Sequence, residues 1–342
     1  MRSPEKSVVP RNSRALWRKG AGERKGDLYD SLIPLLRTKP DELDAYIETV
    51  ACNVAITNTE THAHCHFIAL DGNKRPRVKD FARFLGTRIT DFAIPRSEIE
   101  RALDEATETG STAPIVALND KARNLFTSLP QSGEGGEVLL STLAETILRL
   151  PQILTKMVLK TSAEMHVHGS DGIHLSVNRV TGNLALYWGE SKLHKSPADA
   201  VRECFRSVAP FLLGAGGSKA PQERDLQLMR DGIDLNDTKL EQALKRYLNP
   251  DDPMFKRLEY RGLCLIGFDS DAYPTTPNSK EMAEVRREIK EVFRTRSADI
   301  KRWVCAEKIK SFAIEAFCLP FPSVDEFRRA FRIELGFGNG DG

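Results

Sequence analysis

A predicted strand in the middle of the chain ends in an acidic and a basic residue, Glu190 and Lys192. Between residues 184 and 188 large apolar side chains alternate along one face of a predicted strand, and that face then ends in Glu190 and Lys192. Side chains two apart along a strand share a face, so the carboxylate and the ammonium lie about 7 Å apart on the side that was packed in the core. Burying either charge alone would be costly. The two groups therefore either pair or emerge at the sheet edge, and a surface ion pair explains the triplet if it is taken alone.

Asp171 is a second acidic residue, and a predicted β-hairpin would bring it near Glu190. It begins the preceding strand, and the turn over residues 180–183 contains a glycine that supplies the backbone angles of a tight hairpin. The two carboxylates should approach each other, and like charges that converge repel unless a cation lies between them. Glu137, near the start of a predicted helix, offers a third carboxylate. Glu145 lies further along that helix and is the weaker candidate, because only Glu137 borders a glycine-rich linker.

These residue types suit phosphodiester hydrolysis. Asp171, Glu190 and the backbone carbonyl of Ser191 could hold Mg²⁺ or Mn²⁺, with Glu137 as a further ligand and several waters retained. The metal would polarise the scissile phosphate and lower the pKa of a bound water. Lys192 would orient or deprotonate that water, or neutralise charge building on the phosphate. The sequence therefore predicts Asp171, Glu190, Lys192 and Glu137 as catalytic residues.

The elements that position these residues follow from hydrophobic periodicity and turn signals. Strands are predicted over residues 61–70, 156–161, 171–179, 183–193, 258–268 and 311–319. Helices are predicted over residues 30–38, 42–54, 77–87, 96–108, 119–129, 137–150 and 196–213, in two short segments that follow, in two segments over 279–309, and over 323–334. This order predicts an α/β fold in which a mixed central sheet is flanked by helices.

A glycine-rich linker at residues 131–136 divides the predicted chain into an α-rich N-terminal region (28–130) and a nuclease-like domain (131–335). Residues 336–342 are predicted to be a flexible tail, and residues 1–27 a basic one. The first 26 residues carry a net charge of +6 within a total of +2, which leaves −4 on the rest. Such an arm could contact phosphates, although a solvated, disordered tail is the favoured interpretation.

Composition and motifs disfavour several classes of protein. The six cysteines contain no CxxC pair, which indicates reduced, mostly buried thiols in an intracellular, cytoplasmic protein. The longest apolar stretch, near residues 263–268, is too short for a membrane span, and the basic start is not followed by the apolar segment of a secretory signal. Residues 214–219 do not fit the phosphate-binding loop pattern and favour a flexible linker, so the chain has no motor motif.

All seven histidines fall into two clusters. His62, His64 and His66 alternate along one strand face, a spacing that could bind zinc. Apolar residues continue that face, however, and favour a half-buried strand. The second cluster surrounds the carboxylates, where it could contact phosphate, assist proton transfer or simply line a cleft. It consists of His166, His168, His174 and His194.

The order of acid, hairpin and acid-x-lysine resembles the PD-(D/E)xK nuclease superfamily. One departure is that Ser170, and not the superfamily's proline, precedes Asp171. A closer resemblance, to the HamA family, rests on several ordered blocks within about residues 120–335. They are GGEVLLSTLAE (135–145), LTKMVLKTSAEMHVHGSDGIHL (154–175), NLALYWGESKLH (183–194), IDLNDTKLEQALKRYLNP (233–250) and RGLCLIGFD (261–269).

The resemblance to HamA implies the nuclease-like subunit of the Hachiman antiphage defence system, which is associated with DNA degradation upon phage infection and with a helicase partner, HamB. It implies a metal-dependent DNA endonuclease effector held in check by that helicase. Because the chain lacks a motor motif, ATP-driven sensing would belong to the partner. The alternative is a catalytically inactive, nuclease-like subunit that binds DNA or the helicase and relays infection sensing.

Overall fold

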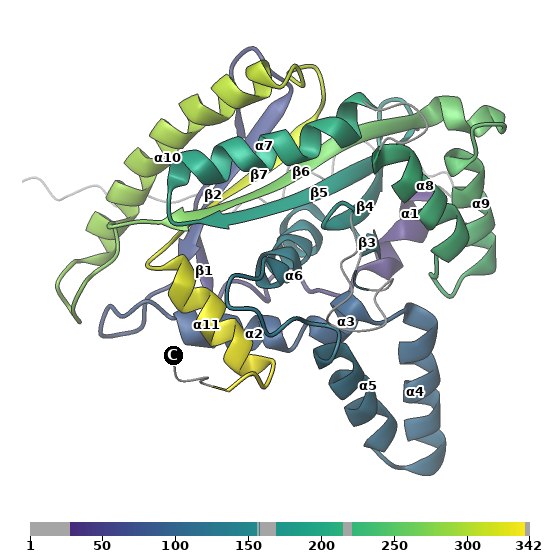
Figure 1. The fold of residues 1–342 in the computed structure, drawn as a ribbon, viewed down its shortest axis with the longest axis horizontal. Coiled ribbons are helices and arrows are strands. Elements are labelled where there is room, and N and C mark those ends of the chain that lie inside the picture. Colours follow the sequence, from purple (N-terminus) through teal and green to yellow (C-terminus); the bar gives the residue numbers. More distant parts are fainter. Residues whose placement is uncertain (1–27, 156, 158–168, 215–220, 339–342) are drawn as a thin grey trace, which may run out of the picture.

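The computed structural model describes residues 28–155, 157, 169–214 and 221–338. These residues form a seven-stranded sheet in the order β1-β2-β7-β6-β5-β4-β3 (Figure 1). Its central strands β2, β7, β6 and β5 are parallel to one another, whereas β1, β4 and β3 pair antiparallel at the two edges. The strands are β1 (Ile47–Ala55), β2 (Thr61–Ile68), β3 (Gln152–Leu154), β4 (Gly172–Val177), β5 (Leu184–His194), β6 (Leu258–Asp269) and β7 (Ile314–Phe321).

Helices cover both faces of the sheet, as expected for its nearly continuous apolar central strands (Figure 1). On one face lie α7 (Pro197–Leu213) and α10 (Met282–Ala306), and α7 packs on β5 through stacked rings of Phe211 and Trp188, whose centroids are 5.2 Å apart. On the other face lie α6 (Glu134–Leu143), α11 (Val324–Glu334) and α2 (Val78–Gly86). The core is therefore two apolar layers with the sheet between them.

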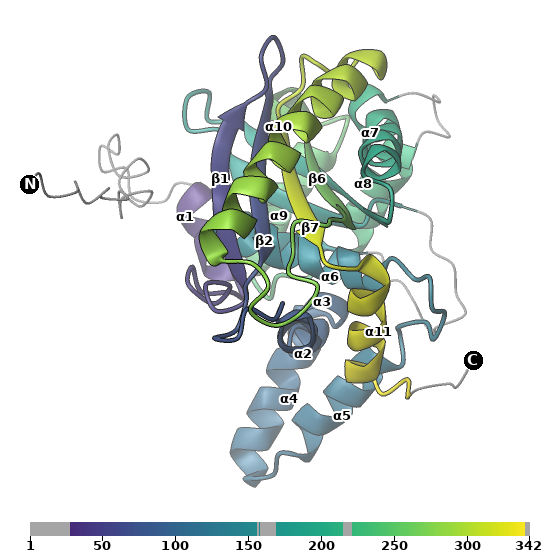
Figure 2. The ribbon, with the colours of Figure 1, turned by 90° about the vertical axis from the view of Figure 1, so that its left-hand side faces the viewer.

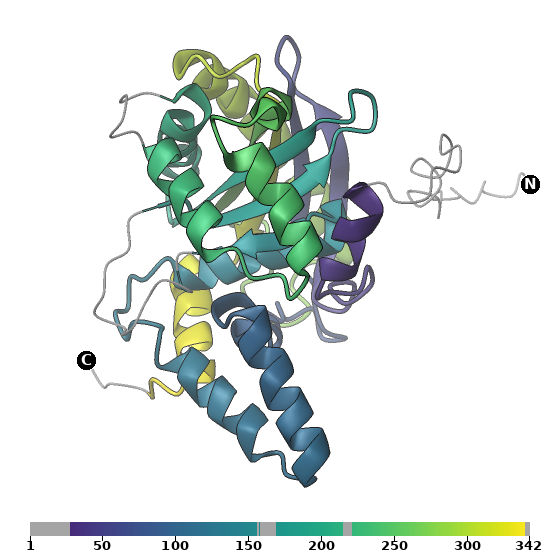
Figure 3. The ribbon, with the colours of Figure 1, turned by 90° about the vertical axis from the view of Figure 1, so that its right-hand side faces the viewer.

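The remaining helices surround this core. A hairpin of α4 (Arg96–Thr109) and α5 (Ala113–Arg123) extends away from the sheet (Figures 2 and 3). None of the helices in the described ranges is long and apolar enough to cross a lipid bilayer. The other helices are α1 (Leu28–Leu32), α3 (Ile89–Ala93), α8 (Pro221–Gly232) and α9 (Thr238–Leu248), with a π-helical continuation of α6 (Ala144–Leu148) and short 3₁₀ segments (Ile33–Leu35 and Pro253–Arg257).

The structure confirms the predicted α/β class and the elements that flank the carboxylates. The predicted strands at 61–70, 171–179, 183–193, 258–268 and 311–319 are β2, β4, β5, β6 and β7. The turn before β5 contains Gly182 at φ +68°, the left-handed region that glycine adopts freely. Ser196 caps α7 as predicted, because its hydroxyl accepts the Asp199 N–H at 3.3 Å and Pro197 opens the helix.

The predicted helix over residues 42–54 is wrong. Residues 47–55 form β1, an edge strand whose exposure follows no clean period of two, so sequence periodicity did not reveal it. Its pairing with β2 brings part of the predicted α-rich region, 28–130, into the central sheet, which therefore crosses the predicted boundary at residues 131–136.

Three smaller differences concern element boundaries. The helix predicted at 119–129 is α5, which begins earlier because Pro114 suits its first turn. The two helices predicted over 279–309 are the single helix α10. The strand predicted at 156–161 lies almost wholly outside the described residues, and β3 at 152–154 is the strand that pairs with β4.

Close packing of the β4–β5 hairpin on α6 gives a test of this fold. A methyl group on Gly189 would lie 2.8 Å from the Gly172 carbonyl oxygen and 3.3 Å from Leu140 Cδ2. Gly189→Ala should therefore lower the free energy of unfolding by about 1–3 kcal/mol in chemical denaturation. Gly232→Ala is the matched control, since a Cβ there meets nothing within 4 Å. Equal stability of the two variants would contradict this packing.

Candidate active site

The register of the β4–β5 hairpin brings Asp171 and Glu190 together. Gly172 lies opposite Gly189 at the end of the ladder, and Glu190 follows Gly189 on β5. The Asp171 N–H donates to the Gly189 carbonyl at 2.9 Å, which holds the residue before β4 against this part of β5. The hairpin therefore brings Asp171 and Glu190 into the same neighbourhood.

The side chain of Asp171 is fixed to the strand that carries Glu190. Its Oδ2 accepts the Ser191 N–H at 2.8 Å, and the residue is 7% exposed. The carboxylate thus takes the place of a β4 backbone carbonyl as the acceptor for this N–H of β5. A hydrogen bond to a charged acceptor in a buried position stabilises by about 1.5–3 kcal/mol, so this contact defines where the Asp171 carboxylate lies.

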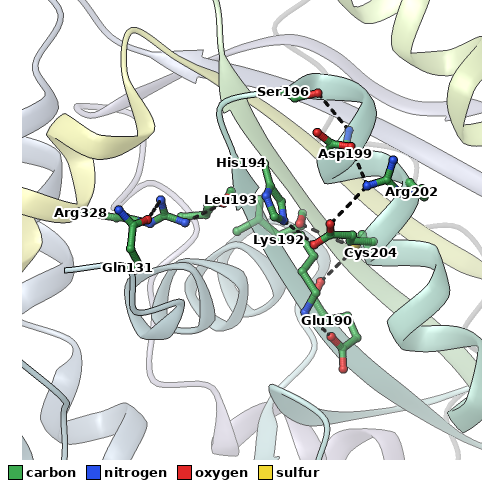
Figure 4. A network of polar contacts seen from close by, with 12 residues as sticks. Gln131, Glu190, Lys192, Leu193, His194, Ser196, Asp199, Arg202, Cys204 and Arg328 are labelled. Carbon is green, nitrogen blue, oxygen red and sulfur yellow. Dashed lines mark hydrogen bonds and ion pairs between the residues drawn. The ribbon is translucent and has the colours of Figure 1, made fainter. Parts of the chain in front are cut away.

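Glu190 and Lys192 form an ion pair on one face of β5 (Figure 4). The Lys192 Nζ lies 3.0 Å from Glu190 Oε2, and the side chains are 26% and 6% exposed. Burial by itself would lower the pKa of Lys192, but the charges of Glu190 and Asp171 outweigh it and raise that pKa well above its usual value. Lys192 is therefore a cation that pairs with Glu190 and is further stabilised by the charge of Asp171.

Helix α7 packs beside this strand (Figure 4). The thiol of Cys204 donates to the Glu190 carbonyl at 3.4 Å, and His194 Nε2 lies 2.8 Å from a carboxylate oxygen of Glu203. Two consecutive residues of α7 thus contact β5 on both sides of Lys192. Cys204, Cys65, Cys264 and Cys318 are buried free thiols, which agrees with the predicted cysteine chemistry.

The start of α6 lies against the same part of β5, on the opposite face. A Cβ on Gly136 would lie 2.7 Å from Ser191 Oγ, so only glycine allows this approach. Glu137 follows in the first turn of the helix and is 5% exposed. Glu145 has a different task, since its two oxygens accept the N–H groups of Arg37 at 3.0 Å and Gln152 at 3.1 Å.

The oxygen donors at this site fit a hard divalent cation. Mg²⁺ binds proteins through one or two carboxylates and keeps several waters, and Asp171 and Glu190 supply two carboxylates. In a β-strand, the N–H and the C=O of one residue point in the same direction. The Ser191 carbonyl is therefore directed toward Asp171, as the Ser191 N–H is. Within the described ranges no group of three or more His, Cys, Asp or Glu side chains is arranged to hold a metal. Glu137 as a further ligand stays a prediction.

The histidines have separate roles. His174 is fully buried on β4, its Nδ1–H donates to the Leu150 carbonyl at 3.0 Å, and burial lowers its pKa to about 4. It is therefore a neutral core residue and does not contact solvent. His194 lies at the end of β5 with Glu203, while His166 and His168 lie outside the described residues. The first cluster, with His64 and His66 buried, forms hydrogen bonds within the sheet, so the zinc interpretation gains no support.

Asp225 is a residue beside the site that the sequence analysis missed. It lies on α8, is 4% exposed, and its Oδ2 accepts the N–H of Ser170 at 3.0 Å. Burial raises its pKa, although this hydrogen bond acts in the opposite direction. Asp225 therefore positions the residue that precedes Asp171. The sequence feature that could have revealed Asp225 is its position among the apolar residues of α8, next to Leu226 and one turn before Met229.

Fold and site together define an α/β protein with a mixed sheet, in which two carboxylates and a lysine lie where the paired strands of a β-hairpin begin and end. The chain belongs to the HamA family, because the family model of that name matches residues 44–335 of the 342. Membership in this family points to a role in Hachiman antiphage defence. No curated protein sequence matches the chain well enough to count as a relative.

Acidification should destabilise the protein through His174. The pKa of His174 is about 4 in the folded protein and 6.5 ordinarily. Between these two values the unfolded chain binds a proton that the folded chain does not. The free energy of unfolding therefore decreases as the pH falls from 6.5 to 4. Between pH 7 and 5 this residue should remove about 2 kcal/mol from the free energy of unfolding. Urea unfolding of His174→Asn should show a correspondingly smaller acid loss. An acid loss unchanged from wild type would contradict the neutral, buried assignment.

Proposed function

We propose that the protein is a metal-dependent DNA endonuclease of the PD-(D/E)xK type and the effector of a Hachiman defence complex. The observation that carries this proposal is the bond between the Asp171 carboxylate and the Ser191 N–H, which sets one acid near the Glu190–Lys192 pair. Acid, acid and lysine in this relation are the groups required for metal-assisted hydrolysis of a phosphodiester. Membership in the HamA family supports the same assignment.

Asp171, Glu190 and the Ser191 carbonyl would hold the divalent cation. Both carboxylates would supply oxygens to it, while Asp171 Oδ2 also accepts the Ser191 N–H and Glu190 Oε2 pairs with Lys192. When bound, Mg²⁺ or Mn²⁺ polarises the phosphate and lowers the pKa of a coordinated water. Glu137, buried at the start of α6 where that helix approaches Ser191, is the further ligand in this proposal.

Lys192 acts as a cation in this proposal. Three roles were open to it, and the raised pKa favours two, namely orienting the attacking water and neutralising charge that develops on the phosphate. Deprotonation of the water is disfavoured, since an ammonium group has no lone pair. The ion pair with Glu190 holds the amine ready at the strand end, and its partial exposure leaves it open to a substrate.

DNA and a HamB-like helicase are the proposed partners. A nuclease without base-reading elements needs external restraint, and the chain has no motif for ATP-driven movement of its own. The helicase would hold the nuclease site inactive until it moves along phage-altered DNA. The other candidate function, a non-catalytic relay subunit, is disfavoured by the presence of Asp171, Glu190 and Lys192 in one intact arrangement.

Cleavage assays on point variants test the proposal. Glu190→Ala and Lys192→Ala should each reduce cleavage of plasmid DNA by more than ~100-fold, because loss of one preorganised charged group at a reacting phosphate already has an effect of that size. Purified protein would be incubated with plasmid and with single-stranded RNA, with Mg²⁺ or with a chelator, and the chelator should abolish cleavage. Lys195→Ala is the matched control, since that lysine is exposed and pairs with Asp325 outside the site.

The thermal stability of each variant must be measured beside its activity, because an unpaired Lys192 or Glu190 could unfold the protein. A folded Glu190→Ala protein that still cleaves would contradict the assignment. Wild-type protein that binds DNA but cleaves nothing with Mg²⁺ or Mn²⁺, alone or with the helicase and ATP, would favour the relay function instead.

A further inference from the structure

A second set of nucleophile, base and acid lies in the sheet, toward the edge opposite β4. Cys52 on β1, His64 on β2 and Glu315 on β7 are neighbours across three adjacent strands. The Cys52 Sγ lies 3.3 Å from His64 Nδ1, and His64 Nε2 lies 2.8 Å from Glu315 Oε2. A thiol, an imidazole and a carboxylate joined in this order have the arrangement by which enzymes activate a nucleophile.

This set is separate from the site at Asp171. The sheet register aligns Glu190 with Cys264, then with Ala316 and with Ala63, so these side chains share one face. His64 follows Ala63 and therefore projects from the other face. The two sets thus lie on opposite faces of the sheet and on strands of its two halves, and neither shares a residue with the other.

A bulge in β1 aims Cys52 at His64. The ladder between β1 and β2 shifts register between Ala51 and Val54, and Asn53 within the shift has φ +55°. Residues other than glycine rarely adopt this backbone region, and bulges of this kind redirect a side chain. The Asn53 N–H, released from the ladder, donates to His64 Nδ1 at 3.2 Å.

These contacts define the proton arrangement on His64. In the neutral ring Nδ1 accepts the Asn53 N–H, so the ring hydrogen lies on Nε2 and is donated to Glu315. The lone pair of Nδ1 is then also directed at the Cys52 thiol. Burial alone would lower the pKa of His64, but the bonds to Cys52 and Glu315 outweigh it and raise that pKa to about 9. The imidazole is thus basic enough to take a thiol proton.

Access also suits a nucleophile. His64 is 1% exposed, whereas Cys52 is exposed at the edge strand. The base is therefore shielded from water while the sulfur faces solvent. Reactive cysteines have this combination of partial exposure and a neighbouring cationic or basic group.

We propose that Cys52, His64 and Glu315 form a reactive thiol centre that exchanges with small disulfides. His64 Nδ1 takes the proton of Cys52, and the thiolate attacks one sulfur of the disulfide. The disulfide bond of the small molecule breaks as a new one forms to Cys52, and the departing thiolate takes the proton back from His64. Cys52 is oxidised to a mixed disulfide, and half of the small molecule is reduced to a thiol.

The groups around Cys52 suit thiol–disulfide exchange better than they suit acyl transfer. Exchange requires a thiolate, a proton carrier and an open approach. Acyl transfer would also require preorganised donors for an oxyanion. Near Cys52, the contacts of the described residues include one backbone donor, the Asn53 N–H. This donor is already bonded to His64 Nδ1, so it does not serve an oxyanion.

Thiol modification of the full-length protein tests the proposal, with Cys305 as the internal reference. Cys52 and Cys305 are the exposed cysteines of the described residues. Rates with glutathione disulfide at neutral pH would be measured by intact mass in Cys305→Ser, which keeps Cys52, and in Cys52→Ser, which keeps Cys305. Cys52 should react about tenfold faster, because His64 is placed to take its proton as the attacking thiolate forms.

Variants of the base and of the acid separate activation from simple exposure. In the Cys305→Ser background, His64→Gln and Glu315→Gln should each bring Cys52 close to the rate of Cys305. His66→Gln should leave the rate unchanged, since His66 lies on the same strand face but contacts Thr49 and not Cys52. If His64→Gln fails to fold, Glu315→Gln decides, because it keeps the shape of the side chain.

Two results would overturn the proposal. One is a Cys52 that reacts no faster than Cys305 in folded protein. The other is a fast Cys52 whose rate is the same in Glu315→Gln and, where it folds, in His64→Gln. Neither result bears on the nuclease site, whose residues stay unchanged in all of these variants.

Discussion

One hydrogen bond determines the geometry of the candidate site, that from the Ser191 N–H to the Asp171 carboxylate, 2.8 Å long. It lies where β4 begins, and it fixes one oxygen of the Asp171 carboxylate relative to β5. The rest of the site depends on it, because the charge of Asp171 together with that of Glu190 keeps Lys192 protonated despite its partial burial. The positive charge of Lys192 reduces the cost of burying the two acids, because it offsets their mutual repulsion.

The surrounding fold keeps this bond in place from three directions. Helix α7 bonds to the backbone of Glu190, α6 approaches Ser191 through Gly136, and Asp225 of α8 holds the residue before Asp171. Each contact involves backbone or a glycine, so the positions are set by the path of the chain more than by flexible side chains. A site with this support can remain in place while a metal or a phosphate exchanges, as preorganised catalysis requires.

How much of this could be predicted from the sequence differs between elements. Glu190, Lys192 and Asp171 were found because a period-two strand ended in charge and a glycine turn preceded it, both of which are local features. The edge strand β1 was misassigned, because its exposed residues lack that alternation. Asp225 was missed for another reason, since only tertiary packing brings α8 to Ser170. The Cys52, His64 and Glu315 set is equally invisible locally, as it depends on a parallel pairing of distant strands.

The central claim is that Asp171 and Glu190 present their oxygens to one divalent cation. Anomalous diffraction from crystals soaked in Mn²⁺ tests it most directly, because the scattering identifies the ion and its position. The account predicts a single strong peak about 2.0–2.3 Å from oxygens of Asp171 and Glu190, consistent with hard-ion coordination, with Lys192 displaced from Glu190 or sharing its carboxylate. Density in which the Lys192 ammonium alone lies between the two carboxylates, with no anomalous peak there at saturating Mn²⁺, would contradict it.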